Sequence, residues 1–333
     1  MARETLLLVC PGRGSYGKAE LGSLARSGAD LSAFDAIRRE NGRATLAELD
    51  GAERFSPGVH LAGPNAAPLI YAGGIADAAA IDRDRYEVVA VTGNSMGWYT
   101  TLAVAGAVGA EQGFRIADAM GVNSGRHGAG GQLVLRLLDD AWRPVPALRE
   151  RLLALAETTG CALSIDLGGA LVIAGPDEGL RVFADRADVE TTRLAGHGPF
   201  HTLLMAESSA AAVAELPAKW FGNPDVPLID GRGHIWRRWA SEPVAMWRYT
   251  FEAQILQAYD FALALTVALR EFAPDRVVLL GPGDVLGGAI AQMLVDLRWL
   301  GMASREGFAE RQASDPFLLS MARPEQRTRL IAP

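Results

Sequence analysis

The sequence predicts an α/β fold in which a large domain carries a small inserted α+β unit. Residues 6–10 and 276–280 are short apolar runs typical of buried strands, and each leads directly into a loop containing glycine and proline. A third such run, residues 87–92, ends at a glycine-flanked serine and is followed by a helical stretch. A buried strand followed by a tight turn and a helix is the repeating unit of α/β proteins.

The inserted unit follows a glycine-rich segment at residues 125–131. From there, residues 128–201 predict strand, helix, hairpin and helix in succession, which is typical of a small ferredoxin-like module. We therefore expect the large domain to comprise residues 1–127 and 202–300. Residues 301–333 are polar and rich in arginine, and they predict a loosely held C-terminal extension.

Helices are expected on both sides of the insert and within it. Their predicted ranges are 68–81, 111–120, 203–214, 261–272 and 285–297 in the large domain and 146–159 and 177–186 in the insert. Residues 217–258 are predicted to be irregular and hold four of the seven tryptophans. We expect these indoles to pack against the body of the protein, and the alternative is a docking face for a partner.

Composition limits the classes of function. A formal net charge of -7 argues against non-specific binding of nucleic acid, which needs a basic surface. No apolar stretch reaches membrane-spanning length, so no membrane association is expected. Cys10 and Cys161 each lie in apolar runs and predict small buried residues, not a disulfide, which suits a reducing cytoplasm. No His, Cys or carboxylate cluster has ligand spacing, so no metal and no bound cofactor are expected.

The segment Gly93 to Gly97 has the pattern G-x-S-x-G and places Ser95 between a predicted strand and a predicted helix. The glycines remove the Cβ atoms that would clash in such a sharp turn, so the serine hydroxyl would project from the edge of the sheet. The N-terminus of the following helix favours negative charge developing at the same place. These features favour a serine nucleophile, and the alternative is a serine at an ordinary turn.

A serine nucleophile needs a base, and histidine is the usual one. The histidines are His60, His127, His197, His201 and His234. His201 is the best candidate because it follows the insert on a loop that opens the next helix of the large domain. His197, on the same loop, is its nearest rival.

Five motifs occur along the chain in a fixed order. They are PGRGS at 11–15, GNSMG at 93–97, SIDLGGALVIAG at 164–175, GPFH at 198–201 and VLLGPGDVLGG at 278–288. In sequence and order they resemble the motifs of the malonyl-CoA:acyl-carrier-protein transacylase family. The resemblance covers roughly residues 5–300 and implies a large α/β hydrolase-like domain that carries a ferredoxin-like subdomain.

The resemblance also implies an activity. Ser95 would take an acyl group from acyl-CoA and pass it to the phosphopantetheine thiol of an acyl carrier protein, with His201 moving the proton. The backbone N–H groups of Arg13 and Met96 would form the oxyanion hole. Asp260 is expected to orient His201 as the third member of a triad, and the alternative is that it caps the following helix.

Substrate-binding positions implied by the resemblance are Gly12, Asn94, Met120 and Phe200. Family members that bind malonyl groups pair the substrate carboxylate with an arginine on the helix after the nucleophile, and Met120 takes that place here. A buried carboxylate without a partner costs several kcal/mol, so we expect an uncharged acyl chain. Arg13, which replaces a glutamine at the pocket mouth, is the alternative anchor for a malonyl carboxylate.

Three other functions remain open from the sequence. An acyl hydrolase on the same scaffold would discharge the acyl-serine with water. An esterase of the α/β-hydrolase type would need a triad such as Ser95, Asp225 and His234, and would leave the other glycine loops unexplained. A non-catalytic docking subunit would not need the serine and histidine to be present.

Overall fold

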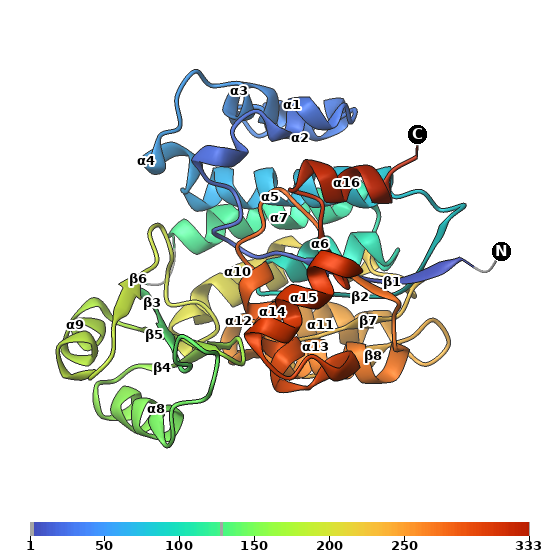
Figure 1. Ribbon diagram of the computed structural model, residues 1–333. Coiled ribbons are helices and arrows are strands. Elements are labelled where there is room, and N and C mark those ends of the chain that lie inside the picture. Colours follow the sequence, from blue (N-terminus) through green and yellow to red (C-terminus); the bar gives the residue numbers. More distant parts are fainter. Residues whose placement is uncertain (1–2, 127–128, 333) are drawn as a thin grey trace.

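Two β-sheets organise the chain in the computed structural model, which describes residues 3–126 and 129–332 (Figure 1). The larger sheet has the strand order β11-β10-β1-β2-β7-β8, and all its neighbours are parallel except β7 and β8. Its strands are β1 (Glu4–Cys10), β2 (Tyr86–Gly93), β7 (Leu228–Ile229), β8 (Ile235–Trp236), β10 (Arg276–Leu279) and β11 (Leu318–Ser320). β1 lies between β2 and β10, so Leu8 pairs with both Val91 and Val278.

β1 is buried on both faces because helices cover the large sheet from both sides. Leu6, Leu8 and Cys10 pack into one apolar cluster, while Leu7 and Val9 pack into the other, as the two-residue period of a strand requires. The first cluster includes residues of α5 (Gly63–Ala80), α6 (Gly97–Val104) and α7 (Ala110–Arg126), and the second includes residues of α13 (Phe261–Phe272) and α14 (Gly287–Asp296).

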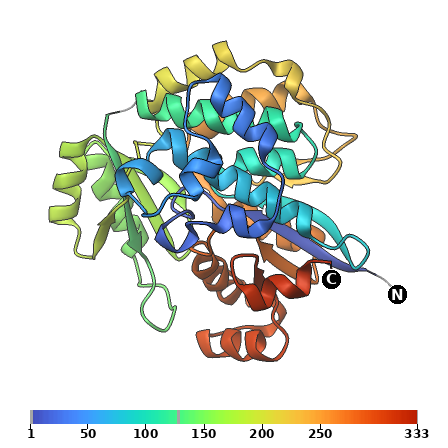
Figure 2. The same cartoon turned by 90° about the horizontal axis from the view of Figure 1, so that it is seen from above.

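The smaller sheet, in the order β6-β3-β5-β4-β9, belongs mainly to the insert. Its strands are β3 (Gly131–Arg136), β4 (Ala162–Asp166), β5 (Ala170–Gly175), β6 (Thr191–Arg193) and β9 (Tyr259–Asp260), and α8 (Leu148–Thr158) and α9 (Asp177–Arg186) pack on it. Figures 1 and 2 both show this unit as a lobe on one side of the large domain. β9 comes from the large domain and pairs in parallel with β4, so the two units share one sheet. The expected domain boundary at residues 127 and 128 lies outside the described residues.

The remaining helices lie around these sheets. They are α1 (Ser23–Ser27), α2 (Ser32–Glu40), α3 (Leu46–Asp50), α4 (Pro57–His60), α10 (Ala206–Glu215), α11 (Pro243–Phe251), α12 (Ala253–Leu256), α15 (Arg305–Ser314) and α16 (Pro324–Leu330), with short 3-10 helices at Lys18–Glu20, Leu203–Met205, Ala218–Trp220 and Trp299–Gly301. Within the described residues, no helix is both long enough and apolar enough to cross a membrane.

α5 begins at Gly63 and not near Pro68, where the sequence suggested a start. Pro68 lies inside the helix, and because proline has no N–H it leaves the carbonyl of Pro64 without its helical donor. The guanidinium of Arg38 supplies the missing bond, with Nη1 donating to Pro64 O at 2.6 Å. Arg38 is fully buried and is also paired with Asp118, so a tertiary contact makes the proline acceptable at this position.

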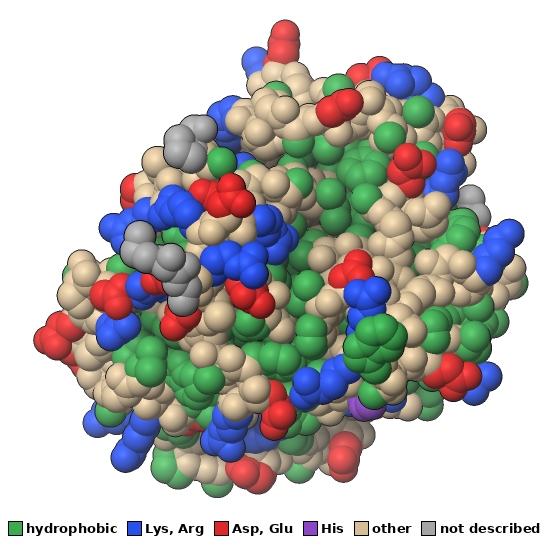
Figure 3. Space-filling model, turned by 90° about the vertical axis from the view of Figure 1, so that its right-hand side faces the viewer, with side chains coloured by type: hydrophobic (Ala, Val, Ile, Leu, Met, Phe, Trp, Pro, Cys, Tyr) green, Lys and Arg blue, Asp and Glu red, His purple; other side chains and the backbone are tan. Residues whose placement is uncertain are grey.

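The segment 217–258 is more regular than the sequence suggested, since it contains β7, β8, α11 and α12. Three of its indoles pack against the body: Trp236 is buried, Trp220 and Trp247 are partly buried, and Trp247 Nε1 donates to Leu216 O at 2.7 Å. Trp239 is the exception, with 90% of its surface exposed. On the face shown in Figure 3, positive, negative and hydrophobic side chains are interspersed.

The expectation of a loosely held extension at residues 301–333 is wrong. Strand β11 extends the large sheet beside β10, and the side chains of Phe317, Leu319 and Leu330 are buried. The sequence misled because the apolar stretches of this segment are short and lie among polar residues. The three residues of β11 form an edge strand that is too short to give a periodic pattern.

Replacing Leu330 with Ala tests whether the C-terminal segment belongs to the core. Because this side chain is fully buried in the first cluster, we expect Leu330→Ala to lower the free energy of unfolding by about 2–5 kcal/mol. Arg329, the exposed neighbour on the same helix, gives a matched control. Arg329→Ala should change the free energy of unfolding by no more than about 0.5 kcal/mol. Urea unfolding of both variants decides the matter, and equal stabilities would mean that the segment is only loosely attached.

Candidate active site

Ser95 lies in the tight turn between β2 and α6, with its backbone in the left-handed region at φ 56°. Few non-glycine residues adopt this conformation, so the turn is strained. The flanking glycines are required by close approach: a Cβ on Gly93 would lie 2.6 Å from Thr101 Oγ1, and one on Gly97 would collide with the carbonyl of Cys10. The predicted strand, turn and helix around the serine are therefore present.

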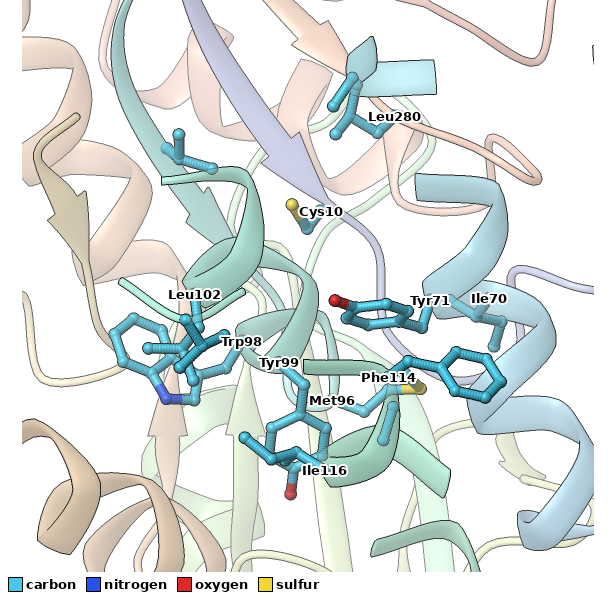
Figure 4. Packing of buried hydrophobic residues seen from close by; sticks show 14 of the residues in the cluster. Cys10, Ile70, Tyr71, Met96, Trp98, Tyr99, Leu102, Phe114, Ile116 and Leu280 are labelled. Atoms are coloured by element: carbon cyan, nitrogen blue, oxygen red, sulfur yellow. The ribbon is translucent and has the colours of Figure 1, made fainter. Parts of the chain in front are cut away.

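The helix after Ser95 is held by apolar packing against its neighbours. Trp98 and Leu102 are fully buried, and Trp98 Nε1 donates to Thr250 Oγ1 of α11 at 2.9 Å. Figure 4 shows Met96, Trp98, Tyr99 and Leu102 on this helical segment, with Cys10 at the end of β1 nearby. This packing fixes the turn that carries the serine.

His201 is brought to Ser95 from the far side of the insert. Its Nε2 lies 2.7 Å from Ser95 Oγ, and the histidine is 4% exposed. Its own backbone also has positive φ, at 59°. Two non-glycine residues in the left-handed region, 106 positions apart in sequence, thus meet in one hydrogen bond.

Gln254, on α12, contacts both members of this pair. Its main-chain carbonyl lies 2.6 Å from His201 Nδ1, and its side-chain Nε2 donates to Ser95 O at 3.0 Å. A carbonyl can only accept, so Nδ1 must carry the proton and Nε2 presents its lone pair to the serine hydroxyl. The sequence suggested Asp260 for this role and did not identify Gln254.

Asp260 does not form a triad with His201, so that prediction is wrong. Its Oδ1 accepts a hydrogen bond from the N–H of Leu263 at 2.7 Å and caps the N-terminus of α13. The main-chain carbonyl of Gln254 takes the position next to His201 Nδ1 in its place. The alternative given for Asp260, an N-cap, is what the structure contains.

Burial keeps His201 neutral. It lowers the pKa of His201 to about 4, and the hydrogen bond to Gln254 offsets only part of that effect. Burial, the charge of Arg13 and the proximity of His201 together lower the pKa of His197 to about 3. His197 Nδ1 lies 2.7 Å from Gln132 Oε1, so this rival histidine belongs to a contact with the insert and not to Ser95.

The first glycine loop lies against the serine turn. A Cβ on Gly12 would lie 2.6 Å from Asn94 O and 3.4 Å from the Cβ of Ser95, so glycine is needed for this approach. In the described part of the chain, the backbone N–H groups of Arg13 and Met96 have no hydrogen-bond acceptor. Both loops flank Ser95, and the assignment of these two groups as an oxyanion hole stays a prediction.

A narrow pocket with a cavity volume of about 60 Å³ opens above Ser95. Its walls come from α5, α6, α7, α10, α12 and the loops, and the lining residues are Arg13, Ala67, Ser95, Met96, Tyr99, Met120, Gly121, Ser124, Phe200, His201, Met205, Ser208, Gln254 and Ile255. Two of the expected substrate-binding residues, Met120 and Phe200, are among them. The other two, Gly12 and Asn94, are not on the wall.

Among the described residues that line the pocket, Arg13 is the only arginine or lysine. Its Nη2 donates to Leu61 O at 2.6 Å and to Gly196 O at 2.7 Å, and its guanidinium lies 5.4 Å from the ring centre of Phe200. Burial lowers the pKa of Arg13 to about 10, so the side chain stays positively charged at neutral pH. Among the described residues, no group of three or more His, Cys, Asp or Glu side chains could hold a metal ion.

Comparison with known proteins identifies solved structures that share this fold. No family model matches the sequence, and no curated protein matches it. Solved structures do: the malonyl-CoA:ACP transacylase of Synechocystis sp. PCC 6803 matches with a TM-score of 0.74 and 18% identity over 98% of this chain and 100% of that one. The chain has the fold of these transacylases.

Two further structures agree. The MCAT of Mycobacterium tuberculosis has a TM-score of 0.72 and 20% identity over 97% of this chain and 98% of its own. A malonyl-transacylase in complex with a type II PKS acyl-carrier protein has a TM-score of 0.69 and 20% identity, and the match covers 87% of this chain and 93% of that one. The predicted large α/β domain with a ferredoxin-like subdomain is thereby confirmed, and the motif resemblance is confirmed at the level of the fold.

The low pKa of His201 predicts how the reactivity of Ser95 depends on pH. Protonated His201 cannot accept the serine proton, so labelling by a fluorophosphonate should stay level from pH 8 to about 5 and fall only as pH approaches about 4. Intact-protein mass gives the labelling rate, and circular dichroism at each pH shows that the fold persists. A midpoint near the ordinary histidine value of about 6.5 would contradict the effect of burial.

A substitution at Asp260 separates a capping role from a triad role. Asn is a good N-cap, so Asp260→Asn should keep the helix and leave the labelling rate of Ser95 within about twofold of the natural protein. Loss of a triad carboxylate typically lowers the rate by about 10⁴-fold. Ser95→Ala gives the unlabelled baseline, and a large loss in Asp260→Asn would restore the triad hypothesis.

Proposed function

We propose that this protein is an acyltransferase that moves an acyl group from acyl-CoA to the phosphopantetheine thiol of an acyl carrier protein through an acyl-Ser95 intermediate. The observation that carries the proposal is the 2.7 Å contact between Ser95 Oγ and His201 Nε2 on a strained turn. The fold shared with the transacylases supports it, as does a structural neighbour that is bound to its acyl-carrier protein.

In this proposal each step of the transfer is assigned to a residue of the site. Ser95 Oγ attacks the thioester carbonyl while His201 Nε2 takes its proton, and the backbone N–H groups of Arg13 and Met96 stabilise the negative oxygen. The carbonyl of Gln254 stabilises the imidazolium through Nδ1–H. Collapse of the intermediate breaks the carbon–sulfur bond, and the leaving thiol takes the proton from His201. The carrier thiol then attacks acyl-Ser95 by the reverse sequence.

The pocket favours an uncharged acyl chain. Met120, Met205 and Ile255 give it a soft apolar wall, and Met120 stands where the resemblance implies an arginine in malonyl-binding relatives. Desolvating a carboxylate against such a wall is costly unless a cation pairs with it. An acyl chain without a terminal charge meets no such cost.

A malonyl substrate is the second candidate, and Arg13 is the observation that favours it. This side chain is cationic and lies on the pocket wall. However, two backbone carbonyls already accept hydrogen bonds from its Nη2, so only Nε and Nη1 are left for a carboxylate. The first proposal therefore has the stronger support.

Acylation by a panel of acyl-CoAs tests both candidates. After brief incubation, intact-protein mass should show an adduct from acetyl- or medium-chain acyl-CoA. Malonyl-CoA should react at least about tenfold more slowly, because the Nη2 hydrogens of Arg13 are already bonded to two carbonyls and pair poorly with its carboxylate. Ser95→Ala should show no adduct from any of them.

The alternatives give different results in the same assay. If malonyl-CoA reacts fastest and Arg13→Ala abolishes that reaction, the malonyl candidate is correct; the substitution keeps the backbone N–H at this position. If CoA is released steadily in the absence of carrier protein and no adduct accumulates on Ser95, the protein is a hydrolase. No adduct and no CoA release from any thioester would contradict the acyltransferase proposal as a whole.

A further inference from the structure

The pocket wall contains a hydroxyl group that the mechanism does not use. Ser208, on α10, is fully buried and lines the pocket, and its Oγ has no hydrogen-bond partner among the described residues. Met205 lies three positions earlier on the chain and lines the same pocket, as expected for neighbours on one helical face. Ser208 thus belongs to the part of the pocket wall that is formed by the segment following His201 in the chain.

Two nearby serine hydroxyl groups are paired, in contrast to that of Ser208. Ser209 Oγ, on the next residue, donates to Phe251 O at 2.6 Å, and Ser124 Oγ, on the pocket wall, donates to Gly121 O at 3.0 Å. Buried polar groups normally have a partner, because an unpaired one loses its hydrogen bonds to water without replacement. The hydroxyl of Ser208, a residue that lines the pocket, therefore lacks a partner that a ligand could supply.

We propose that Ser208 is a specificity-determining residue that hydrogen-bonds an uncharged oxygen on the acyl chain, a hydroxyl or a ketone, beyond the thioester. This inference rests on the proposed acyltransferase function. A serine hydroxyl can donate and accept, so it suits either group. The thioester carbonyl itself is placed at Ser95, so Ser208 must meet a different atom of the substrate.

The surroundings of Ser208 favour a neutral oxygen over a carboxylate. Met120, Met205 and Ile255 line the same pocket and offer no charge to balance an anion. Arg13, the cationic side chain among the described residues of the wall, donates hydrogen bonds to the carbonyls of Leu61 and Gly196. A hydroxyl on a mostly apolar wall is a typical device for fixing the orientation of a mostly apolar ligand.

The test compares acyl-CoAs that differ by one oxygen. Butyryl-CoA is compared with its 2-, 3- and 4-hydroxy and 3-oxo analogues, and the rate of Ser95 acylation at limiting substrate is measured by intact-protein mass. The natural protein should favour at least one oxygenated analogue by about tenfold or more, since a site built to bond a hydroxyl rejects the analogue that lacks it. In Ser208→Ala that ratio should fall to near one, chiefly through slower reaction of the oxygenated chain.

Ser209→Ala is the matched control. It removes the neighbouring hydroxyl, which is bonded to Phe251 and does not line the pocket, so the ratio should stay as in the natural protein. The unfolding midpoint separates a structural from a recognition role: Ser208→Ala should unfold at the same or higher urea concentration, because it removes an unpaired hydroxyl, and Ser209→Ala at a lower one.

The outcomes distinguish the two proposals. Acylation of Ser95 by every analogue, with a ratio that Ser208→Ala leaves unchanged, would overturn the role of Ser208 and leave the acyltransferase intact. A natural protein that prefers butyryl-CoA to all the oxygenated chains, or that prefers malonyl-CoA and loses that preference in Ser208→Ala, would also overturn it. No acylation by any thioester would overturn the proposed function and this inference with it.

Discussion

Gln254 holds the two reactive residues in one geometry. Its main-chain carbonyl fixes the ring and tautomer of His201, while its side-chain amide fixes the backbone of Ser95. Both of those residues have positive φ, a conformation that costs about 1–3 kcal/mol at each non-glycine position and persists only where the surroundings enforce it. The hydroxyl-to-imidazole contact therefore depends on a short helix from a third region of the chain.

The insert contributes to the same constraint from the other side. Ser164 Oγ on β4 donates to Phe200 O at 2.8 Å and also accepts a 2.6 Å bond from Gln132 Nε2 on β3, so the loop carrying His201 is attached to the small sheet. β9, five residues after Gln254, pairs with β4 and ties the third region to the same sheet. The small domain thus positions the histidine and its carbonyl partner together, and the large domain positions the serine.

Local patterns were sufficient for most of the fold. The apolar runs of β1, β2 and β10 are buried on both faces, and such runs keep their meaning in any tertiary context. α9 and α13 begin and end at the predicted residues. The start of α5 could not be predicted, because the carbonyl freed by Pro68 is satisfied by Arg38 from another helix. Nor could β11, whose three residues form a strand only because β10 offers a free edge.

By itself the sequence determined that Ser95 lies in a glycine-flanked strand-to-helix turn and that His201 is its best partner, because both depend on local residue types. The tertiary structure alone decided what lies behind the histidine. A main-chain carbonyl exists at every position, so Gln254 leaves no mark in the sequence, whereas Asp260 suggested a carboxylate and proved to be a helix cap. The unpaired hydroxyl of Ser208 was equally hidden, since pairing and burial depend on which distant segments meet.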